Sequence, residues 1–168
     1  GNMKVDTVKK THSPSMDIQV SSNFERQLFE SYKRNSNAVN KIMGSFSKTG
    51  NQILHDQIIK DLQLIYNTYS VSNLQTLETI KYFNKNFGYL ADPHTATGLK
   101  VLNEIESENI TISLACAHPA KFSDAIKKAI GVSPKLPKEI INIFDKEEKM
   151  VILNNKTQVI KNHILNNL

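Results

Sequence analysis

Residues 111–131, TISLACAHPAKFSDAIKKAIG, change hydrophobic period halfway along, and this change constrains the fold more than any other stretch. The first half alternates apolar and polar residues, which predicts a β-strand over 110–115. Pro119 suits the first position of a helix, and the apolar residues after it recur at helical spacing as far as Gly131, a typical helix stop. The segment therefore predicts a strand, a tight turn and a helix, a unit found in α/β folds.

Cys116, Ala117 and His118 occupy the predicted turn. In open α/β sheets ligands bind where a strand ends and the next helix points its unpaired N–H groups into a crevice. The turn is therefore a candidate binding site. The alternative is an ordinary strand-to-helix connection with a buried thiol. These residues alone favour that alternative, because buried cysteine is common.

A second unit of the same kind is expected near the N-terminus. Residues 16–20 alternate as in a half-buried strand, and Ser22 with Glu25 gives the capping-box pattern S-x-x-E for the helix that follows. Side-chain donors crowd the turn at 21–23, either to cap the helix alone or as part of a site. Spacing alone favours capping. A further short strand is expected over 5–8.

Residues 36–88 are expected to be almost entirely helical, as an insert or cap without chemistry of its own. Apolar residues recur there at helical spacing, and Ser72 with Gln75 forms another capping box. After this region Asp92 is a suitable N-cap for a helix that contains Gly98. A glycine inside a helix costs about 1 kcal/mol relative to alanine and usually marks close approach of another backbone.

The C-terminal part begins with a proline-marked loop over 134–137. A short helix near 138–144, a brief strand over 150–153 and a last helix from Lys156 are expected after it. No internal repeat or low-complexity segment is present.

Composition excludes several classes of protein. The length of 168 residues suits one domain, and the net charge of +5 comes from basic residues scattered among acidic ones, so nucleic-acid binding is a minority interpretation. The single cysteine, Cys116, excludes an internal disulfide, and no long apolar run indicates secretion or membrane insertion. A cytoplasmic protein is expected. No histidine pair has the i, i+4 spacing of a helical metal site, so no metal is expected.

Three segments together resemble the C-terminal part of bacterial threonine synthase. In chain order they are SPSMDIQVSSNFERQLFE (13–30), DPHTATG (92–98) and LACAHPAKFSDAI (114–126). They cover most of the chain outside the variable helices. The resemblance implies the α/β fold of pyridoxal-phosphate (PLP) enzymes related to the tryptophan synthase β-subunit. It divides the chain into a strand–helix unit (1–35), a helical insert (36–88) and the rest of the PLP domain (89–168).

The resemblance also implies an activity, the conversion of O-phosphohomoserine and water to L-threonine and phosphate with PLP as cofactor. In the family the Schiff-base lysine and the Gly/Asn-rich loop that grips the cofactor phosphate lie upstream of this region. Neither motif is in this sequence. The chain is therefore expected to be inactive alone and to have the missing N-terminal half of the enzyme as its partner.

The site residues follow from the same resemblance. Cys116 occupies the position where the family usually has threonine, whose hydroxyl bonds the pyridine nitrogen; a thiol is a weaker donor. Cys116 and His118 are accordingly expected to contact the cofactor. The residues expected to support the site are Ser22, Asn23, Arg26, Asp92, His94, Thr95 and Lys121.

Three alternatives remain open at this stage. The chain could be a truncated, non-catalytic interaction module that pairs with a separately encoded N-terminal half. It could be a small basic nucleic-acid binder, an idea based on charge alone. It could also belong to another phospho-amino-acid lyase of the same fold, since most contacts to a substrate phosphate would lie outside this chain.

Overall fold

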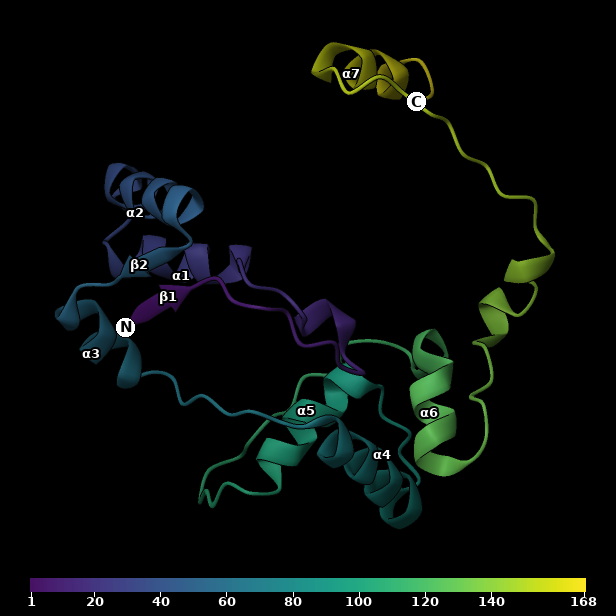
Figure 1. Ribbon diagram of the computed structural model, residues 1–168. Helices are drawn as coiled ribbons and strands as arrows, with labels where there is room; N and C mark the ends of the chain where they lie inside the picture. The colour runs from purple at the N-terminus through teal and green to yellow at the C-terminus, as the bar shows by residue number, and fades with distance from the viewer. The chain divides into compact units, whose positions relative to one another are not determined.

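The computed structural model describes all 168 residues, which form two units, residues 1–135 and residues 136–168. The elements in chain order (Figure 1) are β1 (Asn2–Lys4), the 3-10 helix η1 (Pro14–Met16), α1 (Ser22–Ser31), α2 (Ser36–Thr49), β2 (Asn51–Ile53), α3 (Asp56–Gln63), α4 (Asn73–Phe87), α5 (Pro93–Leu102), η2 (Pro119–Phe122), α6 (Ser123–Ile130), η3 (Lys138–Ile140), η4 (Ile143–Asp145) and α7 (Thr157–Leu165). None of the helices is long and apolar enough to cross a membrane.

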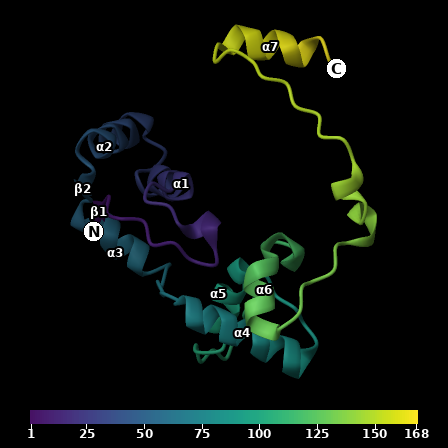
Figure 2. The ribbon, with the colours of Figure 1, turned by 45° about the vertical axis from the view of Figure 1, so that its right-hand side comes forward.

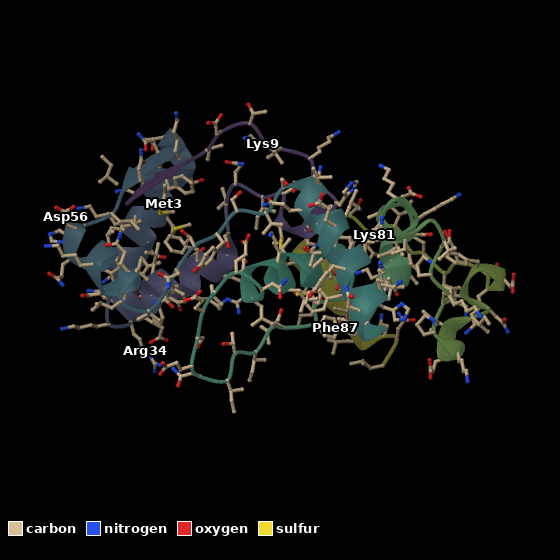
Figure 3. The ribbon with its side chains drawn as sticks, turned by 90° about the horizontal axis from the view of Figure 1, so that it is seen from below. Met3, Lys9, Arg34, Asp56, Lys81 and Phe87 are labelled. Carbon is tan, nitrogen blue, oxygen red and sulfur yellow. The ribbon has the colours of Figure 1, made fainter.

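The first hydrophobic core lies among α1, α2, α3 and a two-stranded sheet. Its buried residues are Leu28, Leu54 and Ile58, and Met3 packs against them. The strands β1 and β2 pair antiparallel with Met3 opposite Gln52, and Met3 is labelled in Figure 3. The apolar residues Phe24, Leu28 and Tyr32, which recur at helical spacing in the sequence, thus form the core face of α1.

The second core lies among α4, α5 and α6, which lie together in Figure 2. Its buried side chains come from all three helices and from the segment before α5; they are Ile80, Ala91, Ala96, Leu99 and Ile126. At the C-terminal end of α4 the rings of Tyr82, Phe83 and Phe87 contact one another, and Figure 3 labels Phe87. This core holds α5 and α6 together and so positions the segments at their N-termini.

Most of the expected helix boundaries are confirmed. Ser72 and Gln75 form the predicted capping box of α4, Asp92 caps α5, and Gly131 ends α6 with φ of 80°, in the left-handed region that favours glycine. The helix expected from Pro119 instead begins as the 3-10 turn η2.

The capping box predicted from Ser22 and Glu25 is wrong by one residue. The N-cap of α1 is Ser21, whose side chain accepts a hydrogen bond from the Phe24 N–H at 3.4 Å. Adjacent serines made the two registers equally compatible with the sequence pattern.

The four strands expected over 5–8, 16–20, 110–115 and 150–153 do not form, and the short strands β1 and β2 were not predicted. The apolar side chains of the expected strand over 110–115 are exposed, Ile110 at 95% and Ile112 at 79%. A strand needs a neighbouring strand to pair its backbone N–H and C=O groups, and the one sheet of this chain contains only β1 and β2. Alternation describes an extended chain but supplies no partner.

Gly98 has a close neighbour, but the neighbour is a side chain and not the expected backbone. A Cβ built on Gly98 would lie 2.7 Å from the Ser113 Oγ. That hydroxyl is buried and has no hydrogen-bond partner. Gly98 therefore lets the extended segment 110–115 pass directly over α5.

The second unit, residues 136–168, buries none of its residues. Its large apolar side chains, including Phe144 at 84% exposed and Ile152 at 86%, have little apolar contact within the unit. The helix predicted from Lys156 is confirmed as α7, which carries Ile160, Ile164 and Leu165 as a partly exposed apolar face.

Replacing Ile80 with alanine is expected to reduce the free energy of unfolding by about 3 kcal/mol, because the side chain is fully buried in the α4–α6 core. Urea denaturation measures the change. Leu74→Ala is the matched control on the same helix. Leu74 is 65% exposed, so its loss should change the free energy by less than about 0.5 kcal/mol. Equal losses for both variants would contradict the placement of this core.

The substitution Gly98→Ala is expected to stabilise the protein by about 1 kcal/mol only in a Ser113→Ala background. With Ser113 present, the added methyl meets its hydroxyl, whereas the Ser113 Cβ lies at an ordinary 4.0 Å. Thermal unfolding of the two single variants and the double variant measures the coupling. An equal effect of Gly98→Ala in both backgrounds would rule out this contact.

Candidate functional site

The Asp92 carboxylate is the centre of the candidate site. Asp92 is 1% exposed and caps the N-terminus of α5. Its Oδ1 accepts the His94 N–H at 2.9 Å and lies 3.1 Å from the His94 Nδ1. Its Oδ2 accepts the Thr95 hydroxyl and, at 3.2 Å, the Ala117 N–H. These donors replace the water that burial removes from the carboxylate.

Thr95 connects this carboxylate to the 116–118 turn. Its hydroxyl donates to Asp92, and its oxygen accepts the Cys116 N–H at 2.9 Å. The motif that begins at Asp92 and the turn, far apart in the sequence, are therefore joined through two successive backbone N–H groups of the turn. The sequence singled out both segments, and the structure brings them together.

The Cys116 side chain, in contrast to its backbone, is free. The residue is exposed, and its Sγ has one contact, to the Leu114 carbonyl oxygen at 3.6 Å. The thiol can therefore meet a bound molecule, although the predicted strand before it does not form.

His94 is buried and has a hydrogen-bond partner at each ring nitrogen. Nδ1 faces Asp92, and Nε2 accepts the Ser15 N–H at 3.3 Å. Because Ser15 can only donate there, we assign the ring proton to Nδ1. The ring also packs against Phe122, with centroids 4.7 Å apart. His94 thus joins α5 to the loop before α1, and neither nitrogen is free for a ligand.

The loop that carries Ser15 is held by a second aspartate. The Asp17 carboxylate accepts the Thr11 N–H and the Thr11 hydroxyl, each at 2.7 Å. These two hydrogen bonds, the backbone one foremost, lower the pKa of Asp17 from its ordinary value. The loop is therefore most firmly closed when Asp17 is ionised.

His118 is the last residue of the turn and the N-cap of η2, and Lys121 lies within η2. The His118 Nδ1 accepts the Ala120 N–H at 3.1 Å, so this histidine caps η2. The Lys121 Nζ lies 5.8 Å from the centre of the Phe122 ring. Both residues are exposed, as is Cys116.

The structure does not join Ser22, Asn23 and Arg26 to the Asp92 network, since none of them bonds to it. Asn23 and Arg26 line a separate groove of about 1330 Å³ formed by α1, α3 and the segment after α3. There the Tyr66 hydroxyl donates to the Gln27 Oε1 at 2.6 Å. Sequence reasoning missed this pair, which no motif marks.

Sequence reasoning also missed what Ser15, Ala117 and Phe122 contribute to the site, although it placed Ala117 in the candidate turn. The first two contribute backbone N–H groups, which carry no side-chain signal. Phe122 counted only as part of an apolar stripe. No group of three or more His, Cys, Asp or Glu side chains is arranged to hold a metal ion. The arrangement positions a turn and exposes one thiol.

Known proteins similar to this chain are threonine synthases. The family model described as threonine synthase, C-terminal, matches residues 95–164. The threonine synthase of Pseudomonas aeruginosa is 39% identical over 154 residues, which are 90% of this chain and 33% of that protein.

Two solved structures are similar as well. The PLP-bound threonine synthase from Brucella melitensis has a TM-score of 0.82 and 36% identity, covering 98% of this chain and 36% of that one. The yeast threonine synthase has a TM-score of 0.75 and 29% identity, covering 96% of this chain and 37% of that one. The chain thus spans about a third of the length of these relatives. The likeness confirms the predicted fold class, the α/β fold of the C-terminal part of these enzymes, although the expected strands are unpaired in this chain.

The substitution Asp92→Asn is expected to lower the free energy of unfolding by about 3 kcal/mol. Both carboxylate oxygens accept hydrogen bonds from N–H or O–H groups, and in asparagine one of these oxygens is replaced by an amide nitrogen that can only donate. Chemical denaturation measures it. The control is Asp124→Asn in the first turn of α6, where the side chain is exposed and the change should stay below about 0.5 kcal/mol. A neutral Asp92→Asn would show that the network does not stabilise the fold.

Proposed function

We propose, since this chain is homologous to the C-terminal portion of threonine synthases, that it belongs to a PLP-dependent lyase that converts O-phosphohomoserine and water to L-threonine and phosphate. One observation carries the proposal. The two motifs DPHTATG and LACAHPAKF, which the resemblance had selected, meet in one hydrogen-bonded network within a chain that superposes on PLP-bound threonine synthase over 98% of its length.

The side chains at the turn suit one part of the cofactor. A pyridine nitrogen needs only a weak hydrogen-bonding partner, and the exposed Cys116 thiol is such a group. We assign Cys116 to the ring nitrogen and His118 to the neighbouring cofactor surface. When bound, PLP supplies the electron sink for the reaction. The phosphate of the cofactor has no cradle here, since no glycine-rich loop is present.

The other residues hold these two in place. Asp92, His94 and Thr95 fix the turn and the loop before α1 through the hydrogen bonds described above. Lys121 adds positive charge beside the turn. Ser22, Asn23 and Arg26 belong, in this proposal, to a separate wall of the site. Asn23 and Arg26 line the groove there, and the guanidinium of Arg26 would attract an anionic group of the substrate.

The remaining parts of the site are proposed to come from the region that precedes this segment in the relatives. That region would supply the Schiff-base lysine and the phosphate loop, so the isolated chain is proposed to be inactive. The exposed side chains of Ile110, Ile112 and Leu114 support the pairing, because an extended segment with an apolar face suits the edge of a sheet. The division at 1–35, 36–88 and 89–168 remains our proposal for the domain layout.

We place the protein in the cytoplasm, because its cysteine is a free, exposed thiol of the kind that a reducing compartment maintains. Another phospho-amino-acid lyase of the same fold remains the second candidate. This chain contains no complete phosphate site, so its residues do not distinguish O-phosphohomoserine from another phospho-amino acid.

The activity is tested by phosphate release from O-phosphohomoserine, with L-threonine measured as the second product. The full-length protein that contains this chain is expected to release both in equal amounts with PLP, and the chain of 168 residues alone is expected to release neither. O-phosphoserine serves as the competing substrate. Turnover by the isolated chain would overturn the proposed incompleteness, and a preference for O-phosphoserine would favour the second candidate.

A further inference from the structure

We propose that Thr95, oriented by Asp92, is a positioning residue that holds the Cys116 thiol at the ring nitrogen of the cofactor. The proposal deepens the proposed function and rests on it. Thr95 does not touch the cofactor in this scheme. It acts through the backbone of the turn.

The directions of the two hydrogen bonds of the Thr95 hydroxyl show how Asp92 orients it. A threonine hydroxyl has one proton, and a carboxylate can only accept, so the Thr95 proton goes to Asp92. The Thr95 oxygen is then left as an acceptor for the Cys116 N–H at 2.9 Å. Asp92 therefore determines which way Thr95 points its lone pairs, and Thr95 determines where the turn is held.

The hydroxyl of Thr95 departs from the usual hydrogen-bonding pattern of threonine in a helix. Threonine hydroxyls in helices commonly bond a carbonyl of the preceding turn. Thr79 does so with the Gln75 carbonyl at 2.7 Å, and Thr97 with the His94 carbonyl at 2.7 Å. Thr95, buried at 2% exposure, instead joins a residue 21 positions later in the chain. Its hydroxyl connects two segments and not two turns of one helix.

The backbone on either side of the Cys116 thiol is anchored, whereas the thiol itself is not. The peptide N–H groups of Cys116 and Ala117 are anchored, to Thr95 and Asp92 respectively. The thiol itself has only the weak contact to Leu114. The direction of the Cys116 Cα–Cβ bond is therefore set by the two anchored peptides. Because a hydrogen bond weakens steeply with angle and distance, a weak partner such as a thiol depends on this restraint.

The anchor is tested first without cofactor, by amide hydrogen exchange of the 110–118 peptide in the full-length protein. Thr95→Val is expected to accelerate exchange at Cys116 about fivefold or more, because one hydrogen bond is lost. Thr95→Ser should behave as the wild type. Thr79→Val is the matched control, a buried threonine in the same core region that bonds only within its own helix. Equal exchange in the Thr95→Val and Thr79→Val proteins overturns the anchor.

The link to the cofactor is tested by a double-mutant cycle with Cys116→Ala. The readout is the midpoint of the pH titration of the visible absorption of bound PLP. Cys116→Ala and Thr95→Val are each expected to shift this midpoint, and Thr95→Val is expected to add nothing once Cys116 is alanine. An equal shift by Thr95→Val in both backgrounds overturns action through the thiol.

Two further outcomes separate the proposals. If the Thr95→Val protein does not fold, the Cys116→Ala protein still tests the role of the thiol, because the Cys116 side chain is exposed and its loss should not unfold the protein. An unchanged titration midpoint in the Cys116→Ala protein overturns the role of the thiol. If the wild-type full-length protein binds no PLP, the proposed function fails and the ring-nitrogen role fails with it. The exchange measurement then still decides whether Thr95 anchors the turn.

Discussion

A carboxylate removed from water must find other hydrogen-bond donors, and this requirement organises the region around Asp92. Its donors come from its own helix and from the turn after the extended segment, and its histidine neighbour brings in the loop before α1. Segments that begin at residues 13, 92 and 114 are thereby joined. The α4–α6 core beneath them supplies the apolar contacts that make the burial possible.

The rest of the first unit depends on whether each segment can find hydrogen-bond partners for its backbone N–H and C=O groups. Helices satisfy their own backbone groups, so α1 to α6 form wherever the apolar stripes and caps allow. Extended segments need a neighbouring strand; β1 and β2 pair with each other, whereas the segment 110–115 has no strand partner. The exposed side chains of Ile110 and Ile112 are the visible result. In the proposed enzyme these surfaces are covered, and the thiol of Cys116 lies at their end.

The hydrogen-bond network around Asp92 contains residues from the segments that resemble threonine synthase. Two of the three motifs that the sequence resemblance selected, at Asp92 and at Cys116, contribute their central residues to the network, whereas the motif over 13–30 contributes only Ser15 through its backbone. Asn23 and Arg26 lie on a separate groove, and Ser22 is the first residue of α1. In the proposed enzyme these two walls are completed by the part of the protein outside this chain, which spans about a third of its relatives' length.

Sequence alone determined the helices, their caps at Ser72, Asp92 and Gly131, and the segments that carry the site, because these depend on local spacing. Tertiary structure decided the rest. Alternation over 110–115 could not reveal whether a partner strand is present, and two adjacent serines could not reveal which one caps α1. Nor could spacing show that the Thr95 hydroxyl, besides donating to Asp92, accepts the Cys116 N–H. That choice depends on a buried carboxylate and a backbone N–H brought together only by folding.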